Sequence, residues 1–188
     1  NKLIEKMIES SNPDEFNTEG TDPMLRTNQY RHEIVFPLIH RKSMFISIFS
    51  FVERELFLIA SLYQKVNTSF VPLEKTEDTG IDKAKNFFKT NLKINISHID
   101  HWQTLKAYQS IRNFFVHNPY GNIRSDHRSF NNFKKVKSIK LTRYKLDDED
   151  LFYDINVTDQ FCLDVINTAH TFFVNFYDLL EESNKNTR

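Results

Sequence analysis

The sequence has little of what marks a secreted or membrane-bound protein. Its 188 residues contain one cysteine, Cys162, so no disulfide can form within the chain. A run of about 18 apolar residues is absent; the stretch that comes closest, residues 43–63, is broken by Glu53, Arg54 and Glu55. The first residues lack the pattern of a signal peptide. These absences predict a cytoplasmic protein without a membrane partner.

Glycine and proline are also scarce, and the net charge is zero. Only 3 glycines and 5 prolines are present, which predicts few turns and long elements. The 25 basic and 25 acidic side chains cancel, which argues against a protein that coats nucleic acid through bulk charge but allows a local basic strip. Phenylalanine, by contrast, occurs 18 times, enough for a helical core and a partner interface. The length suits one domain, residues 1–188.

Apolar residues recur at helical spacing along much of the chain. Residues 38–66 carry them on more than one face, which allows one face to pack inside the molecule and another in a dimer. Asn118 precedes a proline and should end its helix, and Thr158 or Asp159 should cap the last one. The predicted helices are residues 26–36, then 38–66 beyond a kink near Pro37, 80–92, 97–117 and 158–182.

Two later segments alternate apolar and polar residues. They are residues 136–143 and 151–157, on either side of an acidic turn at 147–150, and they predict a β-hairpin. Residues 120–132 are polar and predicted to be loop, as are residues 11–24 and 67–79; residues 1–10 are weakly helical. The sum is an all-α helical bundle of four or five helices, with a small β-hairpin inserted before the C-terminal helix. Its parts are a core of residues 26–118, a basic loop and hairpin of 120–157, and a helix of 158–183.

The stretch IRNFFVHNPYG, residues 111–121, sets three polar side chains into an apolar helix just before its end. Arg112 offers a permanent charge and a donor fork that matches phosphate oxygens. His117 can give or take a proton near neutral pH, and Asn113 can fix an orientation through hydrogen bonds. No carboxylate cluster stands beside them, so the set does not resemble a metal site. Phosphate binding with proton transfer is what RNA cleavage by its own 2′-hydroxyl requires.

The spacing of Arg112 and His117 limits how both side chains can reach one site. Arg112 and His117 lie about 140° apart around an ideal helix. They share one space only if the helix end distorts or a second copy of the chain completes the site. Metal-free cleavage works best with both an acid and a base, and a two-fold dimer with two His117 side chains near one phosphate would supply them. The alternative is structural, with Arg112 in a salt bridge and His117 at the helix end, favourable with its dipole.

Residues 112–117, RNFFVH, resemble the R-x(4–6)-H motif of HEPN domains, including the polar residue that commonly follows the arginine. Residues 45–56, FISIFSFVEREL, resemble the long helix of that family with its embedded glutamate. Residues 80–88 resemble its short helix before the motif helix, and residues 102–118 resemble the motif helix. The likeness covers residues 42–118. The hairpin is not a general feature of the family.

HEPN domains are compact helical bundles, and many are metal-independent endoribonucleases with two motifs meeting at a dimer interface. The resemblance implies an RNA substrate, a homodimer, no metal and no cofactor. It makes Arg112 and His117 catalytic with help from Asn113, and lets Glu53 orient Arg112; the alternative for Glu53 is a pair with another basic residue at a solvated edge. Some family toxins carry a modified tyrosine two residues after the histidine, whereas Tyr120 lies three residues after it, a departure from that pattern.

Two functions follow from the resemblance. The first is a ribonuclease of the toxin–antitoxin, abortive-infection and anti-phage systems in which the family is widespread, with an antitoxin or sensor protein as partner. The second is a non-catalytic HEPN-like module that dimerises and binds RNA, a nucleotide or a partner protein. Only the nuclease needs the proton of His117.

A basic segment follows the motif. Residues 124–145 hold eight basic side chains and one acidic one, Asp126, with aromatic residues between them. This segment either contacts the RNA backbone or is a solvated hairpin face balanced by the acidic turn. His98 and His101 are three residues apart but lack a third ligand, so no metal site is predicted; Cys162 is predicted to be a small buried residue. The candidates for contact with the RNA backbone are Arg124, Arg128, Lys134, Lys135, Lys137 and Lys140.

Overall fold

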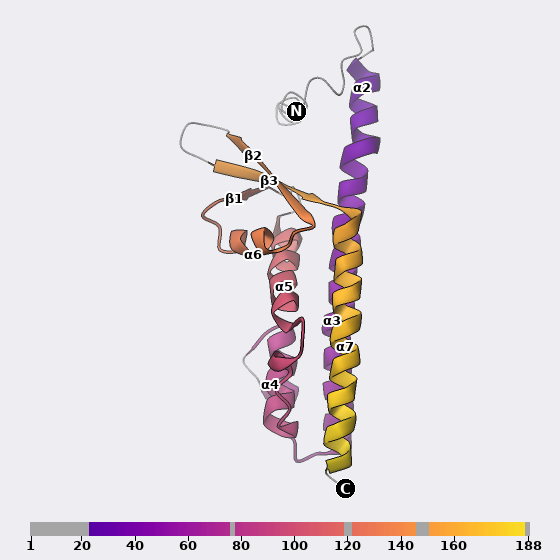
Figure 1. The fold of residues 1–188 in the computed structure, drawn as a ribbon, viewed down its shortest axis with the longest axis vertical. Coiled ribbons are helices and arrows are strands. Elements are labelled where there is room, and N and C mark those ends of the chain that lie inside the picture. Colours follow the sequence, from indigo (N-terminus) through magenta and orange to yellow (C-terminus); the bar gives the residue numbers. More distant parts are fainter. Residues whose placement is uncertain (1–22, 76–77, 119–121, 146–150, 187–188) are drawn as a thin grey trace.

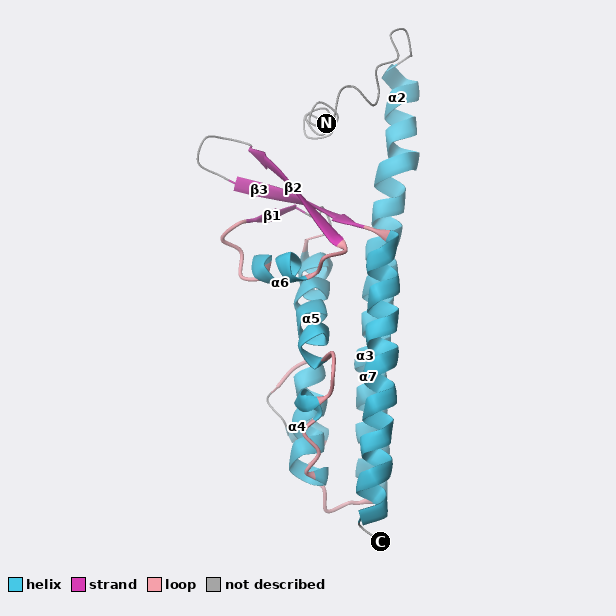
Figure 2. Ribbon diagram, in the orientation of Figure 1, coloured by secondary structure: helices cyan, strands magenta, loops and turns pink. Residues whose placement is uncertain are grey.

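The computed structural model describes residues 23–75, 78–118, 122–145 and 151–186. Helices dominate, and a small antiparallel sheet lies at one end of an elongated molecule (Figures 1 and 2). The predicted helical bundle with a small hairpin is confirmed at this level, whereas the predictions for residues 1–22 and 147–150 lie outside the described residues. The main elements are α2 (Pro23–Tyr30), α3 (Phe36–Val66), α4 (Ile81–Leu92), α5 (Trp102–His117), β1 (Asn122–Arg124), α6 (Phe130–Lys135), β2 (Ile139–Lys145), β3 (Leu151–Val157) and α7 (Asp159–Asn186).

The two helices predicted on either side of Pro37 form one continuous rod (Figure 1). A π-helical turn, Arg31–Val35, joins α2 to α3, and the N–H of Phe36 bonds to the carbonyl of Arg31. Pro37 lies in the first turn of α3, where its missing N–H is best tolerated. The interruption predicted near Pro37 is therefore a widened turn rather than a break in the rod. α3 ends at Val66, as predicted.

Three long helices build the bundle. α3 and α7 run in the same direction: the rings of Phe45 and Phe161 lie 4.8 Å apart near one end, and Asn184 Nδ2 donates to Tyr63 Oη at 3.0 Å near the other. Thr158 caps α7, since its Oγ1 accepts the N–H of Phe161 at 3.2 Å. Among the described helices, none is long and apolar enough to span a membrane.

The core of the bundle is aromatic. The Phe45 ring contacts Tyr108 and Phe115 of α5, each with centroids 6.1 Å apart. Further along, Trp102 of α5 lies 6.0 Å from Phe172 of α7, so α5 runs opposite to α7. Burying one such ring contributes about 1.5–3 kcal/mol, and the abundance of phenylalanine is explained largely by this core.

α5 is shorter than predicted. It begins at Trp102 rather than at residue 97, because residues Ile96–His98 form a separate 3-10 turn and His101 has a left-handed φ of 69°. Asn95 stabilises that turn by accepting the N–H of Ser97 at 3.3 Å. The other end is as predicted: Asn118 has φ −134° and ψ 79°, outside the helical region.

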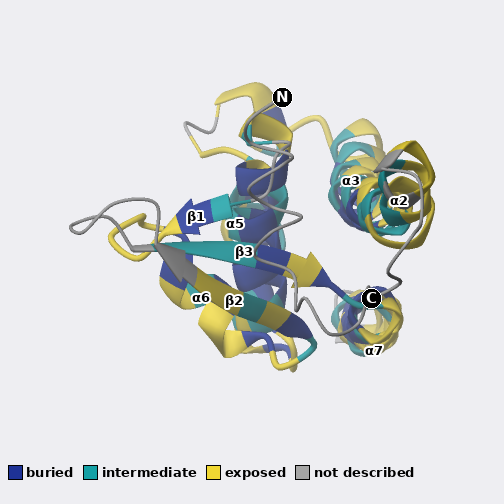
Figure 3. Cartoon of the chain, turned by 90° about the horizontal axis from the view of Figure 1, so that it is seen from above, coloured by how far each residue is buried: buried dark blue, intermediate teal, exposed yellow. Residues whose placement is uncertain are grey.

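The predicted hairpin belongs to a three-stranded sheet in the order β1-β3-β2, with Ile123 of β1 opposite Tyr153 and Leu141 of β2 opposite Ile155. α6 packs beneath the sheet. The loop prediction for residues 120–132 is therefore wrong where β1 and the start of α6 lie. Figure 3 shows α5 beneath the sheet, with α3 and α7 beside it.

Candidate functional site

Arg112 and His117 lie on different sides of α5. The helix stays regular to its end, where the N–H of Asn118 bonds to the carbonyl of Phe114 at 2.8 Å. No distortion therefore brings Arg112 and His117 together within one chain. Arg112 faces α3, whereas His117 is exposed and faces a cleft on the other side.

The Arg112 side is closed. Its Nη2 lies 3.5 Å from Glu53 Oε2 on α3, and its Nη1 donates to Asn113 Oδ1 at 3.0 Å. Its Nε is buried, with no hydrogen-bond partner among the described residues. Burial raises the pKa of Glu53, and the charge of Arg112 opposes that shift. Glu53 thus stands beside Arg112, as the resemblance implied, and its side chain is only 15% exposed.

Gly80, which the sequence did not single out, closes this region. A Cβ at Gly80 would lie 1.8 Å from Gln109 Nε2 and 3.1 Å from Glu53 Oε1, and its φ is +57°. Only glycine fits that space and that backbone conformation. Lys106 donates to Gln109 Oε1 at 2.7 Å and also pairs with Asp82 of α4. The start of α4 is thereby held against both α3 and α5.

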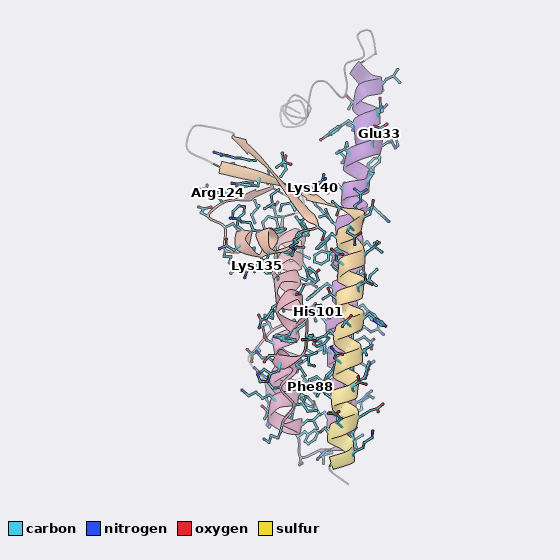
Figure 4. The ribbon with its side chains drawn as sticks, viewed as in Figure 1. Glu33, Phe88, His101, Arg124, Lys135 and Lys140 are labelled. Carbon is cyan, nitrogen blue, oxygen red and sulfur yellow. The ribbon has the colours of Figure 1, made fainter. Side chains whose placement is uncertain are left out.

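The His117 side is open. A cleft of about 910 Å³ lies between α5, β1 and α6. Figure 4 labels Arg124 and Lys135, which lie at the sheet-bearing end of the molecule. Neither Arg112 nor Glu53 lines the cleft. The polar residues that line it include Asn113, His117, Arg124, His127, Arg128 and Lys135.

The structure divides the six predicted RNA contacts into two groups. Arg124, Arg128 and Lys135 line the cleft. The other three do not line it: the Lys134 Nζ lies 5.5 Å from the Phe130 ring centroid, and the remaining two, Lys137 and Lys140, are exposed before and within β2.

The cations of the cleft differ in their partners. Arg124 Nε lies 3.1 Å from Asp126 Oδ1, and its guanidinium lies 5.9 Å from the Phe152 ring centroid. Arg128 and Lys135 have no ion-pair partner within the described part of the chain. An anion entering the cleft therefore meets two exposed positive charges, Arg128 and Lys135, that no carboxylate of the described residues pairs with.

His127 is the cleft residue that sequence reasoning missed. It is exposed, its ring centroid lies 5.2 Å from that of Phe114, and its Nδ1 accepts the N–H of Ser129 at 3.1 Å. The available signal was a histidine inside the basic segment, three residues before the apolar Phe130. That signal does not indicate which way the ring points.

A second hollow, which we call the apolar groove, lies between α3 and α7. It measures about 650 Å³ and is lined by Ile48 and Phe51 of α3 and by Phe173, Val174 and Tyr177 of α7, among others. Phe51 is 57% exposed. The second apolar face predicted for residues 38–66 is thus present, and no other described part of the chain covers it. The dimer contact predicted for it stays a prediction.

His98 and Cys162 do not line the cleft. His98 Nε2 lies 3.1 Å from Asn95 Nδ2, and Cys162 is buried, as predicted. No group of three or more metal-ligating side chains is found in the described ranges. Tyr120 lies outside the described residues.

No family model, no curated protein and no solved structure matches the chain. The HEPN resemblance therefore rests on the sequence motifs of residues 42–118.

Proposed function

We propose that the protein is a metal-independent endoribonuclease of the HEPN type. The observation that carries the proposal is the position of His117, which shares one cleft with Asn113, Arg128 and Lys135. A group able to transfer a proton thus stands among groups suited to phosphate. The 2′-oxygen of RNA would attack the adjacent phosphorus as the bond to the 5′-oxygen breaks. The products are a 2′,3′-cyclic phosphate and a 5′-hydroxyl.

His117, the cleft cations, Arg112 and Asn113 have separate roles in this reaction. His117 transfers a proton at the 2′-oxygen or at the leaving 5′-oxygen. The cleft cations stabilise the charge that builds on the phosphorane. Arg112, held between Glu53 and Asn113, positions the Asn113 amide at the cleft. A homodimer would bring a second His117 to the same phosphate, and so supply both the acid and the base.

The alternative is an RNA- or nucleotide-binding module, and two observations favour it. The Arg112 guanidinium is directed to Glu53 rather than into the cleft. In addition, the ring of His117 has no hydrogen-bond partner among the described residues that would fix its tautomer. In such a module the cleft holds RNA through its cations, and the proton of His117 is not needed.

The proposed setting is a bacterial toxin–antitoxin, abortive-infection or anti-phage system. This step rests on the resemblance of residues 42–118 to HEPN domains. It places the protein in the cytoplasm, with RNA as substrate and an antitoxin or sensor protein holding the nuclease inactive.

The test is incubation of the purified protein with mixed tRNA and mRNA in EDTA, followed by end-group analysis. We expect cyclic-phosphate and 5′-hydroxyl ends, and we expect His117→Ala to lower the rate by about 10²–10⁴-fold. Val116→Ala is the matched control, because Val116 is the preceding residue of α5 and is also exposed. Wild-type cleavage by His117→Ala would remove the catalytic assignment. Binding of RNA without cleavage by any variant would favour the binding module.

A further inference from the structure

The cleft contains a second histidine for which the proposed reaction has no role. His127 lies in the turn between β1 and α6 and lines the cleft together with His117. Its ring meets the ring of Phe114 edge-on, at 5.2 Å and 77°. Phe114 precedes His117 by three residues, about one turn of α5, so the two histidines border neighbouring parts of the same helix surface.

Backbone and side-chain contacts hold His127 in place. Its N–H donates to the carbonyl of Arg124 at 3.1 Å, and its own carbonyl accepts the N–H of Phe130 at 2.8 Å. Its Nδ1 accepts the N–H of Ser129 at 3.1 Å. Together with the contact to Phe114, these bonds fix both the backbone and the ring. A ring already fixed in place loses little freedom when a ligand binds to it.

The bond from Ser129 determines the tautomer of the ring. A backbone N–H can only donate, so Nδ1 of His127 must present its lone pair, and the ring proton lies on Nε2. Among the described residues, no acceptor for this Nε2–H is found. A second proton on Nδ1 would point two N–H groups at each other. The ring is therefore arranged as a fixed hydrogen-bond donor and not as the acid of the reaction.

The surroundings of His127 favour an anion as the acceptor. Arg128 is the next residue, and Arg124 and Lys135 line the same cleft. The cleft also has the length for a strand: Gln103 and His117 both line it, and they lie about 21 Å apart along α5. A positively charged groove of this kind follows the backbone of single-stranded nucleic acid.

We propose that His127 is a ligand-binding residue of the cleft, whose Nε2–H donates a hydrogen bond to a phosphate group of single-stranded RNA. The identity of the ligand as RNA rests on the proposed function. In this assignment His117 transfers the proton, while His127 holds the phosphate beside it.

Two variants separate a ligand contact from a role in the turn. In His127→Asn, the side-chain oxygen can accept the N–H of Ser129, as asparagine commonly does two residues ahead, but the shorter side chain cannot place a donor where Nε2–H lies. His127→Ala removes both the turn bond and the donor. Similar melting temperatures for the wild type and His127→Asn would verify that the turn is kept.

The probe is a short, fluorescein-labelled single-stranded RNA with 2′-O-methyl groups, which blocks cleavage by the 2′-oxygen. We expect His127→Asn to weaken its binding about tenfold, the effect of losing one hydrogen bond to a charged group. Wild-type affinity in His127→Asn would overturn the proposal. Independently of any variant, ¹⁵N NMR of the wild type at neutral pH should find the Nε2–H tautomer of His127, and the Nδ1–H tautomer would overturn the assignment.

These outcomes are distinct from those of the nuclease test. If the wild type binds the probe through His127 but cleaves no RNA, the inference stands and the nuclease proposal fails. If the wild type cleaves RNA and His127→Asn both binds and cleaves like the wild type, the nuclease proposal stands and the inference fails. A wild type that does not bind the probe overturns the role of His127.

Discussion

The two sides of α5 differ in whether their positive charges lie near carboxylates. On the closed side, Lys42 is only 7% exposed, with its Nζ 5.2 Å from the ring centroid of Phe115. Arg112, on the same side, lies beside Glu53. Each of these cations has a carboxylate in its surroundings, since Asp154 of β3 provides the charge that acts on Lys42.

On the open side, Arg128 and Lys135 are exposed and have no ion-pair partner within the described residues. This difference in partners determines which property the cations of each side control. Cations buried beside carboxylates affect the free energy of unfolding and its dependence on pH. Unpaired cations in a cleft affect the binding of anions and its dependence on salt. Variants on the two sides should therefore have separable effects.

The largest effect on stability is expected at Lys42. Burial lowers its pKa to about 8, and the charge of Asp154 opposes this shift. The unfolded chain, with an ordinary lysine pKa, binds more protons than the folded chain between about pH 8 and pH 10.5, so Lys42 makes stability rise with pH across that window. As pH rises through this window, the free energy of unfolding of the wild type should increase by up to about 3 kcal/mol relative to that of Lys42→Met. Urea unfolding at several pH values measures this increase. If the free energies of unfolding of the wild type and Lys42→Met change in parallel with pH, the prediction is wrong.

A smaller loss is expected when Arg112 is removed. Arg112→Ala leaves the largely buried Glu53 without its partner, which should cost about 2 kcal/mol. Adding Glu53→Gln should recover part of that loss, because the uncompensated charge is then gone. The exposed His117→Ala is the matched control and should stay within about 0.5 kcal/mol of the wild type. If Arg112→Ala and His117→Ala destabilise the protein equally, the distinction between the two sides of α5 is wrong.

The smallest effect is expected from the cleft cations. Arg128→Ala with Lys135→Ala should weaken binding of the 2′-O-methyl RNA by about tenfold and lower the slope of log affinity against log salt by about 2, with stability unchanged. Lys134→Ala with Lys140→Ala removes the same charge from outside the cleft and should change the slope less. If both pairs change the slope equally, the cleft is not the RNA site.

The long helices were predictable because each carries enough apolar residues to set its period. α4 and the hairpin strands were found in this way, although β2 begins at Ile139 rather than at residue 136. β1 and α6 were missed since β1 buries one apolar residue, Ile123, and α6 buries two, Phe130 and Phe133, too few for a period. The early start predicted for α5 failed because the left-handed backbone at His101 has no signal in the sequence.

For the site, the angular separation of Arg112 and His117 was predictable, since it follows from five residues of regular helix. That the helix stays regular to Asn118 required the structure. The division of the basic residues also required it, because it depends on which face of α6 meets α5. Lys134 and Lys135 are neighbours in the sequence, yet only Lys135 lines the cleft.

The central claim is that RNA lies along the open side of α5. Photo-cross-linking of a 4-thiouridine-containing 2′-O-methyl RNA, with the sites located by mass spectrometry, tests it most directly. We expect cross-links to the cleft residues between Gln103 and Val136 and their loss in the Arg128→Ala, Lys135→Ala variant. Cross-links concentrated in the apolar groove around Phe51 and Tyr177, unchanged in that variant, would contradict it.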